Sequence, residues 1–257
     1  MRILFIGDIV GSPGRKIVHD RLADILTQRG IDLCIANGEN SASGFGITPR
    51  LAEEIFAAGA EVITGGNHSW DRKEIFDFLP HEPRLIRPAN FPEGTPGKGH
   101  YLGQTRNGVP YAVLNLQGRT FMASQEDPFR MADSLLQKIQ AKVILVDFHA
   151  EATSEKVALG WYLDGRVTAV IGTHTHVTTA DERVLPGGTA YQTDVGMSGP
   201  FDSVIGVEKD QIINRFLTGM PGKFEAAKGD PRMCAALIEC DGATGKALSI
   251  QRIMLGE

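Results

Sequence analysis

The sequence predicts an α/β fold, and three observations support this prediction. Short apolar segments alternate with longer segments in which apolar residues recur about every 3.6 positions, as in amphipathic helices. The segment 143–148 is nearly continuous in apolar residues, which is typical of a strand buried on both faces. Turn residues separate the segments throughout. We expect strands and helices to alternate within a single domain, 1–257.

The first 64 residues predict two helices between three strands. Ser12, which is followed by proline, is the expected N-cap of the first helix, and Gly30 ends that helix. Thr48 begins the second helix, which runs to Gly59. The three apolar segments expected as strands are 3–6, 33–36 and 62–64.

The remainder of the chain begins with a predicted β-hairpin. Asn107 and Gly108 lie between alternating segments within 102–116, and this dipeptide is the strongest short-range hairpin signal. The further expected elements are a helix at 128–139, a strand at 143–148, a short helix at 155–162, a strand at 167–171, a hairpin at 184–191, a helix at 209–217 and two strands on either side of 241–245.

Composition excludes several classes of protein. No apolar run approaches the ~18 residues of a membrane-spanning helix, and no secretory apolar region opens the chain, so we expect a soluble, cytoplasmic protein. Its 26 Lys and Arg against 31 Asp and Glu give a net charge of -5. A protein with this charge is repelled by nucleic acids, so extensive nucleic-acid binding is not expected. The oligomeric state is open, and a homo-oligomer is compatible with the sequence. Three cysteines without metal-binding spacing are expected as reduced core thiols: Cys34, Cys234 and Cys240.

Polar residues gather where five of the predicted strands end. They are Asp8, Glu39 and Asn40, Asn67 and His68, His149, and His174 with His176. Because the carboxyl ends of strands in an α/β fold lie along one edge, we expect these side chains to converge. Carboxylate, amide and imidazole ligands suit Mn, Fe, Zn or Ni, and their number exceeds the four ligands of one structural zinc. The sequence therefore predicts two metal ions.

The charge of such a site favours a phosphate ligand. Two divalent cations, the carboxylates of Asp8 and Glu39 and one hydroxide leave a charge of about +1, which a phosphodiester can neutralise. Two-metal sites generate hydroxide near neutral pH and stabilise the attacking and leaving oxygens of an in-line displacement. An acidic protein can thus bind an anionic substrate without a basic patch.

Each residue of this set also has an ordinary structural interpretation. A single His149 after a strand is more often a hydrogen-bonded structural residue, and Asp8 is equally suited to cap a helix. His174 and His176 resist that interpretation, because residues two apart on an extended segment face the same way and crowd two imidazoles together. The histidines away from strand ends are expected to be surface or structural residues: His19, His81 and His100.

Several of these motifs together resemble a known superfamily. They are Gly7-Asp8, Gly38-Glu39-Asn40, Gly66-Asn67-His68, His149 and the run from Gly172 to His176. In this order they resemble the calcineurin-like metallophosphoesterases. Longer runs at 7–11, 36–40, 146–151 and 160–166 are similar to the YmdB-type bacterial branch, and the resemblance covers nearly the whole chain. It implies a four-layer sandwich of two mixed β-sheets flanked by helices.

The resemblance further implies two metal sites that share one ligand, Glu39. One site would be formed by Asp8, Glu39, Asn40 and His176, and the other by Glu39, Asn67, His149 and His174. The superfamily's usual Asp-x-His is here Asp8-Ile9-Val10, and its usual bridging Asp is here Glu39. One imidazole ligand is therefore missing, and the metal identity is open; similarity implies Fe or Mn, with Zn or Mg as alternatives.

The same resemblance implies the activity. It is hydrolysis of 2′,3′-cyclic nucleotides at the 2′ bond to give 3′-nucleotides, by attack of a hydroxide that bridges the two metals. His68 would be the general acid that protonates the poor leaving oxygen; its alternative role is to orient the phosphate. In the loop 41–46, Phe45 is a candidate to stack on the nucleobase, although an ordinary surface loop is the commoner meaning of such a composition.

Two other functions compete with this one. A phosphomonoesterase or nucleotidase of the same fold would use the same metal centre, but the absence of a dedicated basic cluster favours diesters over the more highly charged monoesters. A regulatory, RNA-associated protein with a metal site is the second alternative. It would predict a basic stripe with exposed aromatic residues, which the sequence lacks.

Overall fold

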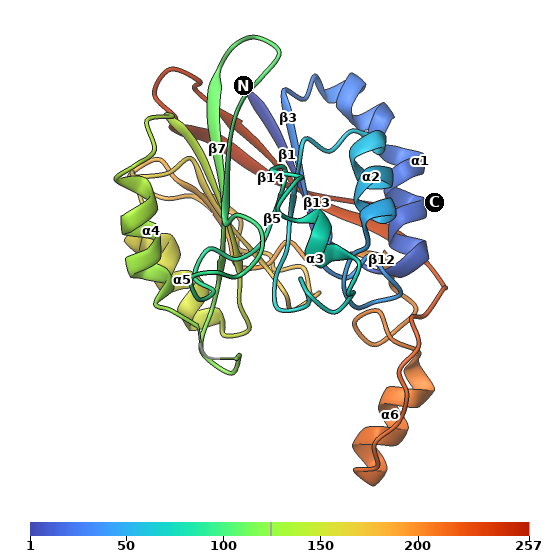
Figure 1. The fold of residues 1–257 in the computed structure, drawn as a ribbon. Coiled ribbons are helices and arrows are strands. Elements are labelled where there is room, and N and C mark those ends of the chain that lie inside the picture. The colour runs from blue at the N-terminus through green and yellow to red at the C-terminus, as the bar shows by residue number, and fades with distance from the viewer. Residues whose placement is uncertain (124, 257) are drawn as a thin grey trace.

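The computed structural model describes residues 1–123 and 125–256. Within them, two mixed β-sheets pack against each other, and helices cover both outer faces (Figure 1). This is the four-layer α/β sandwich that the resemblance implies, so the fold class is confirmed. None of the described helices is both long enough and apolar enough to cross a membrane.

The first sheet contains the strands from the N-terminal third of the chain together with the C-terminal hairpin. Its order is β2 (Asp8–Ile9), β12 (Met197–Pro200), β13 (Pro231–Cys240), β1 (Arg2–Ile6), β3 (Leu33–Asn37), β4 (Val62–Thr64) and β5 (Leu85–Ile86), with β14 (Ala247–Gly256) also paired to β13. The strands from β1 to β5 along this order are parallel, and β13 is antiparallel to β1. The helices against it are α1 (Gly11–Arg29), α2 (Pro49–Ala58) and α3 (Ile75–Phe78).

The second sheet is built from the middle of the chain. Its order is β10 (Arg183–Val184), β11 (Ala190–Gln192), β9 (Ala169–Thr173), β8 (Val143–His149), β7 (Pro110–Gln117) and β6 (His100–Gln104). The four inner strands are parallel, and antiparallel hairpins close both edges, as predicted around 107–108 and 186–188. Two helices cover its outer face: α4 (Pro128–Leu136) and α5 (Thr153–Tyr162).

Three hydrophobic cores separate the four layers. Side chains of β1 alternate between two of them: Ile3 and Phe5 lie between the sheets, whereas Leu4 and Ile6 lie under the helices. Each fully buried side chain of this size contributes roughly 1.5–3 kcal/mol to folding. All three cysteines are buried and unpaired, as expected.

The start of α1 differs from the prediction. Val10, not Ser12, is the N-cap residue, and no side chain caps the helix. The chain enters the helix through Gly11, whose φ of 60° favours glycine and whose N–H donates to Asn40 O at 3.0 Å. The backbone of a neighbouring loop therefore satisfies the first N–H of the helix.

The segment 203–229 projects from the sandwich as an arm that carries α6 (Lys209–Thr218), the orange helix in Figure 1. Its root is paired, since Ala227 N donates to Gly206 O at 2.9 Å. No residue of α6 is buried. Several of the arm's apolar side chains are largely exposed: Ile213, Phe216, Leu217 and Met220.

Candidate metal centre

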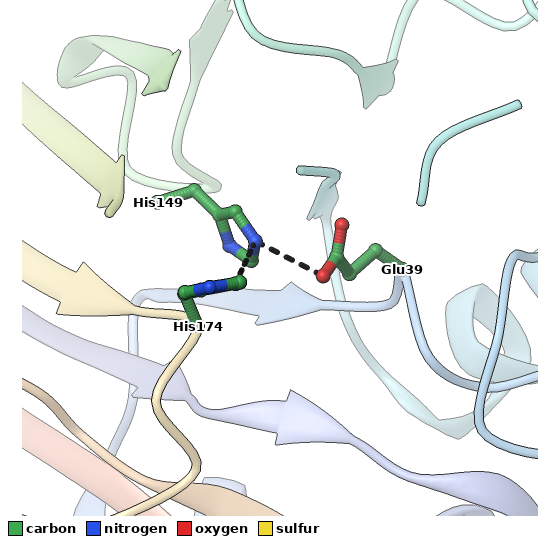
Figure 2. Close-up of side chains that lie close together, drawn as sticks. All are labelled: Glu39, His149 and His174. Carbon is green, nitrogen blue, oxygen red and sulfur yellow. Dashed lines mark hydrogen bonds and ion pairs between the residues drawn. The ribbon is translucent and has the colours of Figure 1, made fainter. Parts of the chain in front are cut away.

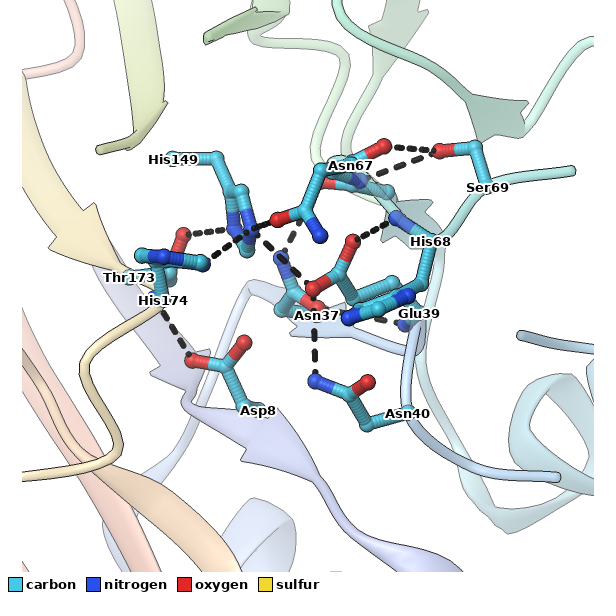
Figure 3. A network of polar contacts seen from close by, with 12 residues as sticks. Asp8, Asn37, Glu39, Asn40, Asn67, His68, Ser69, His149, Thr173 and His174 are labelled. Atoms are coloured by element: carbon cyan, nitrogen blue, oxygen red, sulfur yellow. Dashed lines mark hydrogen bonds and ion pairs between the residues drawn. The ribbon is translucent and has the colours of Figure 1, made fainter. Parts of the chain in front are cut away.

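Both sheets direct polar residues to one place. The eight candidate residues follow or end β1, β3, β4, β8 and β9, and the structure brings them together in one network. All of them except His176 are labelled in Figure 3. The contacts that join them are Asn40 Nδ2 to Glu39 Oε1 (3.2 Å) and to His176 Nε2 (3.1 Å), His149 Nε2 to Asn67 Oδ1 (2.9 Å) and to His174 Nδ1 (3.0 Å), His176 Nε2 to Asp8 Oδ1 (3.8 Å), and His68 N to Glu39 Oε2 (2.9 Å). The predicted convergence is therefore observed.

Glu39 lies at the middle of this network and is 1% exposed. Its Oε1 is 3.0 Å from His149 Nε2, while its Oε2 accepts the backbone N–H of His68. The ligand atoms that Glu39, His149 and His174 offer all lie within 4.8 Å of one another, which suits a metal ion (Figure 2). Glu39 thus contacts residues of both predicted half-sites.

Hydrogen bonds fix which ring nitrogen of His149 faces the centre. Thr173 Oγ1 donates to Asp147 Oδ1 at 2.7 Å, so the same oxygen accepts from His149 Nδ1 at 2.9 Å. In the neutral ring the proton of His149 is then on Nδ1, and Nε2 is the nitrogen that can bind a metal.

The other two imidazoles are oriented in the same manner. His176 Nδ1 donates to Ile205 O at 2.8 Å, which leaves Nε2 toward Asn40. His174 Nε2 lies 3.2 Å from a carboxylate oxygen of Glu151, which leaves Nδ1 toward His149. In its neutral form each histidine therefore presents an unprotonated nitrogen to the centre.

The residues that fix these rings were not predicted from the sequence. They are Asp147, Glu151, Thr173 and Ile205. Only Asp147 gave a local signal, because a carboxylate within an otherwise apolar strand is unusual. The others act through tertiary contacts.

The buried charges shift each other's pKa values strongly. Burial raises the pKa of Glu39, but the nearby His149 and His68 outweigh burial and lower it to about 2. Burial likewise lowers the pKa of His149, but Glu39, Asp8 and Asp147 together raise it to about 9. Burial and the adjacent His149 lower the pKa of His174 to about 3. The pKa of Asp147 is raised to about 6, mainly by burial.

Three features show that the cluster fits a divalent cation. Asp8 is fully buried, yet its Oδ1 has no hydrogen-bond partner among the described residues. His149 Nε2 and His174 Nδ1 lie 3.0 Å apart, so both can approach the same cation once His149 Nε2 is deprotonated. A Cβ on Gly66 would lie 2.3 Å from Glu39 Oε2 and 2.4 Å from His149 Nε2, so the chain leaves the space beside both ligand atoms open.

His68 lies at the edge of the centre, with 28% of its side chain exposed. Its Nδ1 is 2.6 Å from Asp71 Oδ2, and its ring meets the edge of Phe45 with 5.2 Å between the ring centroids. The carboxylate of Asp71 places the proton of a neutral ring on Nδ1 and fixes the ring's direction.

The centre opens into a cavity of ≈ 720 Å³. Its lining includes Glu39 and His68 of the polar network and the apolar Phe216 and Phe224 of the arm. Phe45 lies in the wall and is 37% exposed. The three histidines expected outside the site lie on α1, after α3 and on β6: His19, His81 and His100.

Comparisons with known proteins agree with this fold. A family model described as YmdB-like protein matches residues 4–253. The chain is 52% identical, over 100% of its length and 98% of the other protein, to the Bacillus subtilis (strain 168) protein named 2′,3′-cyclic-nucleotide 2′-phosphodiesterase.

Solved structures give the same result. A structure described as a novel phosphatase from Mycoplasma pneumoniae superposes with a TM-score of 0.95 and 35% identity, covering 100% of this chain and 93% of that chain. The calcineurin-like phosphoesterase YfkN from Bacillus subtilis shares the fold at a TM-score of 0.61 and 12% identity, with 100% and 90% covered. The chain thus has the calcineurin-like phosphoesterase fold and belongs to the YmdB-like protein family.

Proposed function

We propose that this protein is a dimetal phosphodiesterase that hydrolyses 2′,3′-cyclic nucleotides to 3′-nucleotides. The observation that carries the proposal is the arrangement of Glu39, buried between the two groups of predicted ligands at the end of a large cavity. The name of the Bacillus subtilis relative, 52% identical over the whole chain, supplies the substrate class.

The two metal sites follow the contacts of the network. We propose that Asp8, Glu39, Asn40 and His176 hold one ion and that Glu39, Asn67, His149 and His174 hold the other. In support, the Asn40 amide contacts both Glu39 and His176, and Asn67 Oδ1 faces His149 Nε2. Two divalent cations, Fe or Mn with Zn or Mg as alternatives, would supply a hydroxide nucleophile and positive charge for the phosphate.

His68 supplies the proton in this proposal. The 2′-oxygen of a cyclic phosphate is a poor leaving group, so its departure is aided by a proton from a group of suitable pKa. Asp71 holds Nδ1 of His68, so Nε2 is the ring nitrogen that carries the transferred proton. The backbone N–H of His68 donates to Glu39, which ties the acid to the metal centre.

Phe45 is the proposed contact for the nucleobase. It lines the cavity beside His68, and its loop is anchored to the segment that carries the acid. Arg72 makes this anchor by donating to Phe45 O at 2.9 Å and to Ala42 O at 2.6 Å. An anchored, half-exposed aromatic ring is suited to stack on a flat base at low entropic cost.

The first experiment is elemental analysis of the purified protein, followed by assays of 2′,3′-cyclic AMP, 3′,5′-cyclic AMP and a phosphomonoester with and without Mn²⁺. We expect two metals per chain and turnover of 2′,3′-cyclic AMP. Turnover of the monoester alone would indicate a phosphomonoesterase instead. Failure to bind metal under any loading condition would overturn the proposal.

Two variants separate the proposed roles. His68→Ala should keep both metals and lose about 10²- to 10⁴-fold in kcat, because a general acid contributes that much. Glu39→Gln should lose metal. His81→Ala, which alters an exposed histidine outside the network, is the control and should keep wild-type activity. Full turnover by His68→Ala would refute its role as the acid.

A further inference from the structure

A buried ion pair lies behind the loop that carries two of the proposed ligands. Lys156, on α5, is 1% exposed, and its Nζ lies 2.6 Å from Asp194 Oδ2 and 2.7 Å from Thr173 O. Lysine is almost never fully buried unless it is paired, because the ammonium loses its hydration. Neither residue of the pair lines the cavity or belongs to the network of predicted ligands.

Asp194 holds more than the lysine. Its Oδ2 also accepts the N–H of Thr175 at 3.1 Å, and its Oδ1 accepts the N–H of Gly196 at 2.8 Å. Together the two side chains hydrogen-bond the backbone on both sides of His174. Lys156 donates to Thr173 O, and Asp194 accepts from Thr175 N. These are charge-assisted hydrogen bonds, which are stronger than hydrogen bonds between neutral groups.

The segment 173–176 needs these hydrogen bonds, because its backbone is strained. His174 and His176 have φ values of 99° and 64°, a left-handed conformation that residues with a Cβ rarely adopt. Strained residues of this kind persist only where the surroundings over-determine them. The reversal of the backbone at these positions places the two imidazoles on the same centre, so relaxation of the segment would move both rings.

The pair also reaches the N-terminal ligand. Gly196, held by Asp194 Oδ1, accepts the N–H of Asp8 at 3.1 Å. Asp8 Oδ2 in turn accepts the N–H of His174 at 3.2 Å. One carboxylate therefore connects the backbones that carry Asp8 and His174.

We propose that Lys156 and Asp194 are positioning residues for the metal centre, which hold Asp8, His174 and His176 in the arrangement that binds metal. The inference rests on the proposed centre. It predicts that variants without the pair bind metal more weakly even under conditions in which they are fully folded. A purely structural pair would lower stability and leave the affinity of the folded protein unchanged.

The test uses the full-length protein, stripped of metal, with Mn²⁺ affinity measured by calorimetry and folding measured by circular dichroism. Asp194→Asn keeps the side-chain shape and an acceptor oxygen but removes the charge. The double variant Lys156→Met, Asp194→Asn also removes the unpaired buried ammonium, which protects against a failure to fold. We expect both folded variants to bind Mn²⁺ about 10- to 100-fold more weakly.

Asp164→Asn is the matched control. The carboxylate of Asp164 likewise accepts two backbone N–H groups of a turn, from Gly187 at 2.8 Å and from Thr189 at 3.3 Å. That turn carries none of the proposed ligands, so the control should melt earlier and bind Mn²⁺ normally.

The outcomes separate the two proposals. Wild-type affinity in the folded double variant, or equal losses in the control, would overturn the positioning role alone. Two Mn²⁺ bound by the unmodified protein without hydrolysis would overturn the proposed activity, and weaker binding by the variants would still support the positioning role. No Mn²⁺ binding by the unmodified protein would overturn both.

Discussion

Gly66 lies against two of the proposed ligands, at a position where only a hydrogen atom fits. An alanine Cβ would lie 2.3 Å from Glu39 Oε2 and 2.4 Å from His149 Nε2, closer than atoms can approach without a shift. We expect Gly66→Ala to displace both side chains and to reduce metal content in elemental analysis. Gly222→Ala, whose Cβ would meet nothing within 4 Å, is the control. Full metal content in Gly66→Ala would show that these atoms do not bind the ions.

The hydroxyl of Thr173 links Asp147 to His149 and so fixes the orientation of the His149 ring. Thr173→Val keeps the shape of the side chain but removes both hydrogen bonds, at 2.7 Å and 2.9 Å. We expect Mn²⁺ affinity to fall about 10- to 100-fold, the usual cost of losing such a partner. Thr168→Val is matched, since its buried hydroxyl accepts from Ile144 N away from the site. Equal affinities in the two variants would argue against the relay.

The raised pKa of His149 predicts how metal affinity depends on pH. Without metal, its pKa is about 9, so at neutral pH the ring is protonated and a metal must displace the proton. Mn²⁺ affinity should therefore rise steadily from pH 6.5 to 9. Calorimetry in buffers of different ionisation enthalpy should detect the released proton. A flat affinity over this range would show that His149 is neutral before binding.

The same shifts set a pH window for the stability of the metal-free protein. His149 has a folded pKa above its ordinary 6.5, so its contribution is complete below pH 6.5 and is lost as pH rises to about 9. Glu39 has a folded pKa of about 2, below its ordinary 4.5, so its contribution is present above pH 4.5 and is lost as pH falls toward 2. Urea denaturation should show the contribution of this pair to be largest between pH 4.5 and 6.5.

At the residue scale, the sequence revealed the candidate ligands that line the centre but not the residues that orient them. Glu39 and His149 could be recognised because each ends a strand, and strand ends share an edge in this fold. Lys156 lies in the middle of a helix, and Asp194 lies in a loop 38 positions later. Their pairing is a tertiary contact without a local pattern, so periodicity and spacing did not find it.

At the element scale, the arm contributes little to the sandwich. None of the residues of α6 is buried, and the arm's root is closed by a hydrogen bond between Ala227 N and Gly206 O. Replacing 208–225 with a short Gly-Ser turn should leave the melting temperature and the metal content nearly unchanged. The KM for a nucleotide should change, since Phe216 and Phe224 line the cavity. Loss of metal would show that 208–225 supports the centre beyond the hydrogen bond that Ile205 O accepts from His176.

The longer helices and strands were predicted because their apolar residues recur with a regular period. The helix α2 begins after Thr48, whose hydroxyl accepts from Leu51 N, and ends at Gly59, both as predicted. The two-residue strands β2 and β5 and the four-residue strand β12 were missed, since they are too short to show alternation. They form through pairing with distant strands, which the local sequence does not encode.

At the scale of the molecule, we expect the described sandwich to unfold as one unit, consistent with the predicted single domain, 1–257. The strands of each sheet contribute side chains to two of the three cores, so no core can be lost alone. Calorimetric and circular dichroism melting curves should coincide in one transition. Two separated transitions would indicate two domains. The cytoplasmic location and the oligomeric state stay predictions.

The central strand β1 pairs with β3 on one side and with β13 on the other, where Arg2 meets Glu239, 237 positions away. A ribosome that adds 5–20 residues per second needs about 10–50 s to reach that partner. Throughout this time the nascent chain carries an apolar strand with one unpaired edge, a template for aggregation. We therefore expect the newborn protein to be most prone to aggregation during synthesis, since Asp8 meets Met197 of β12 only after most of the chain has been translated.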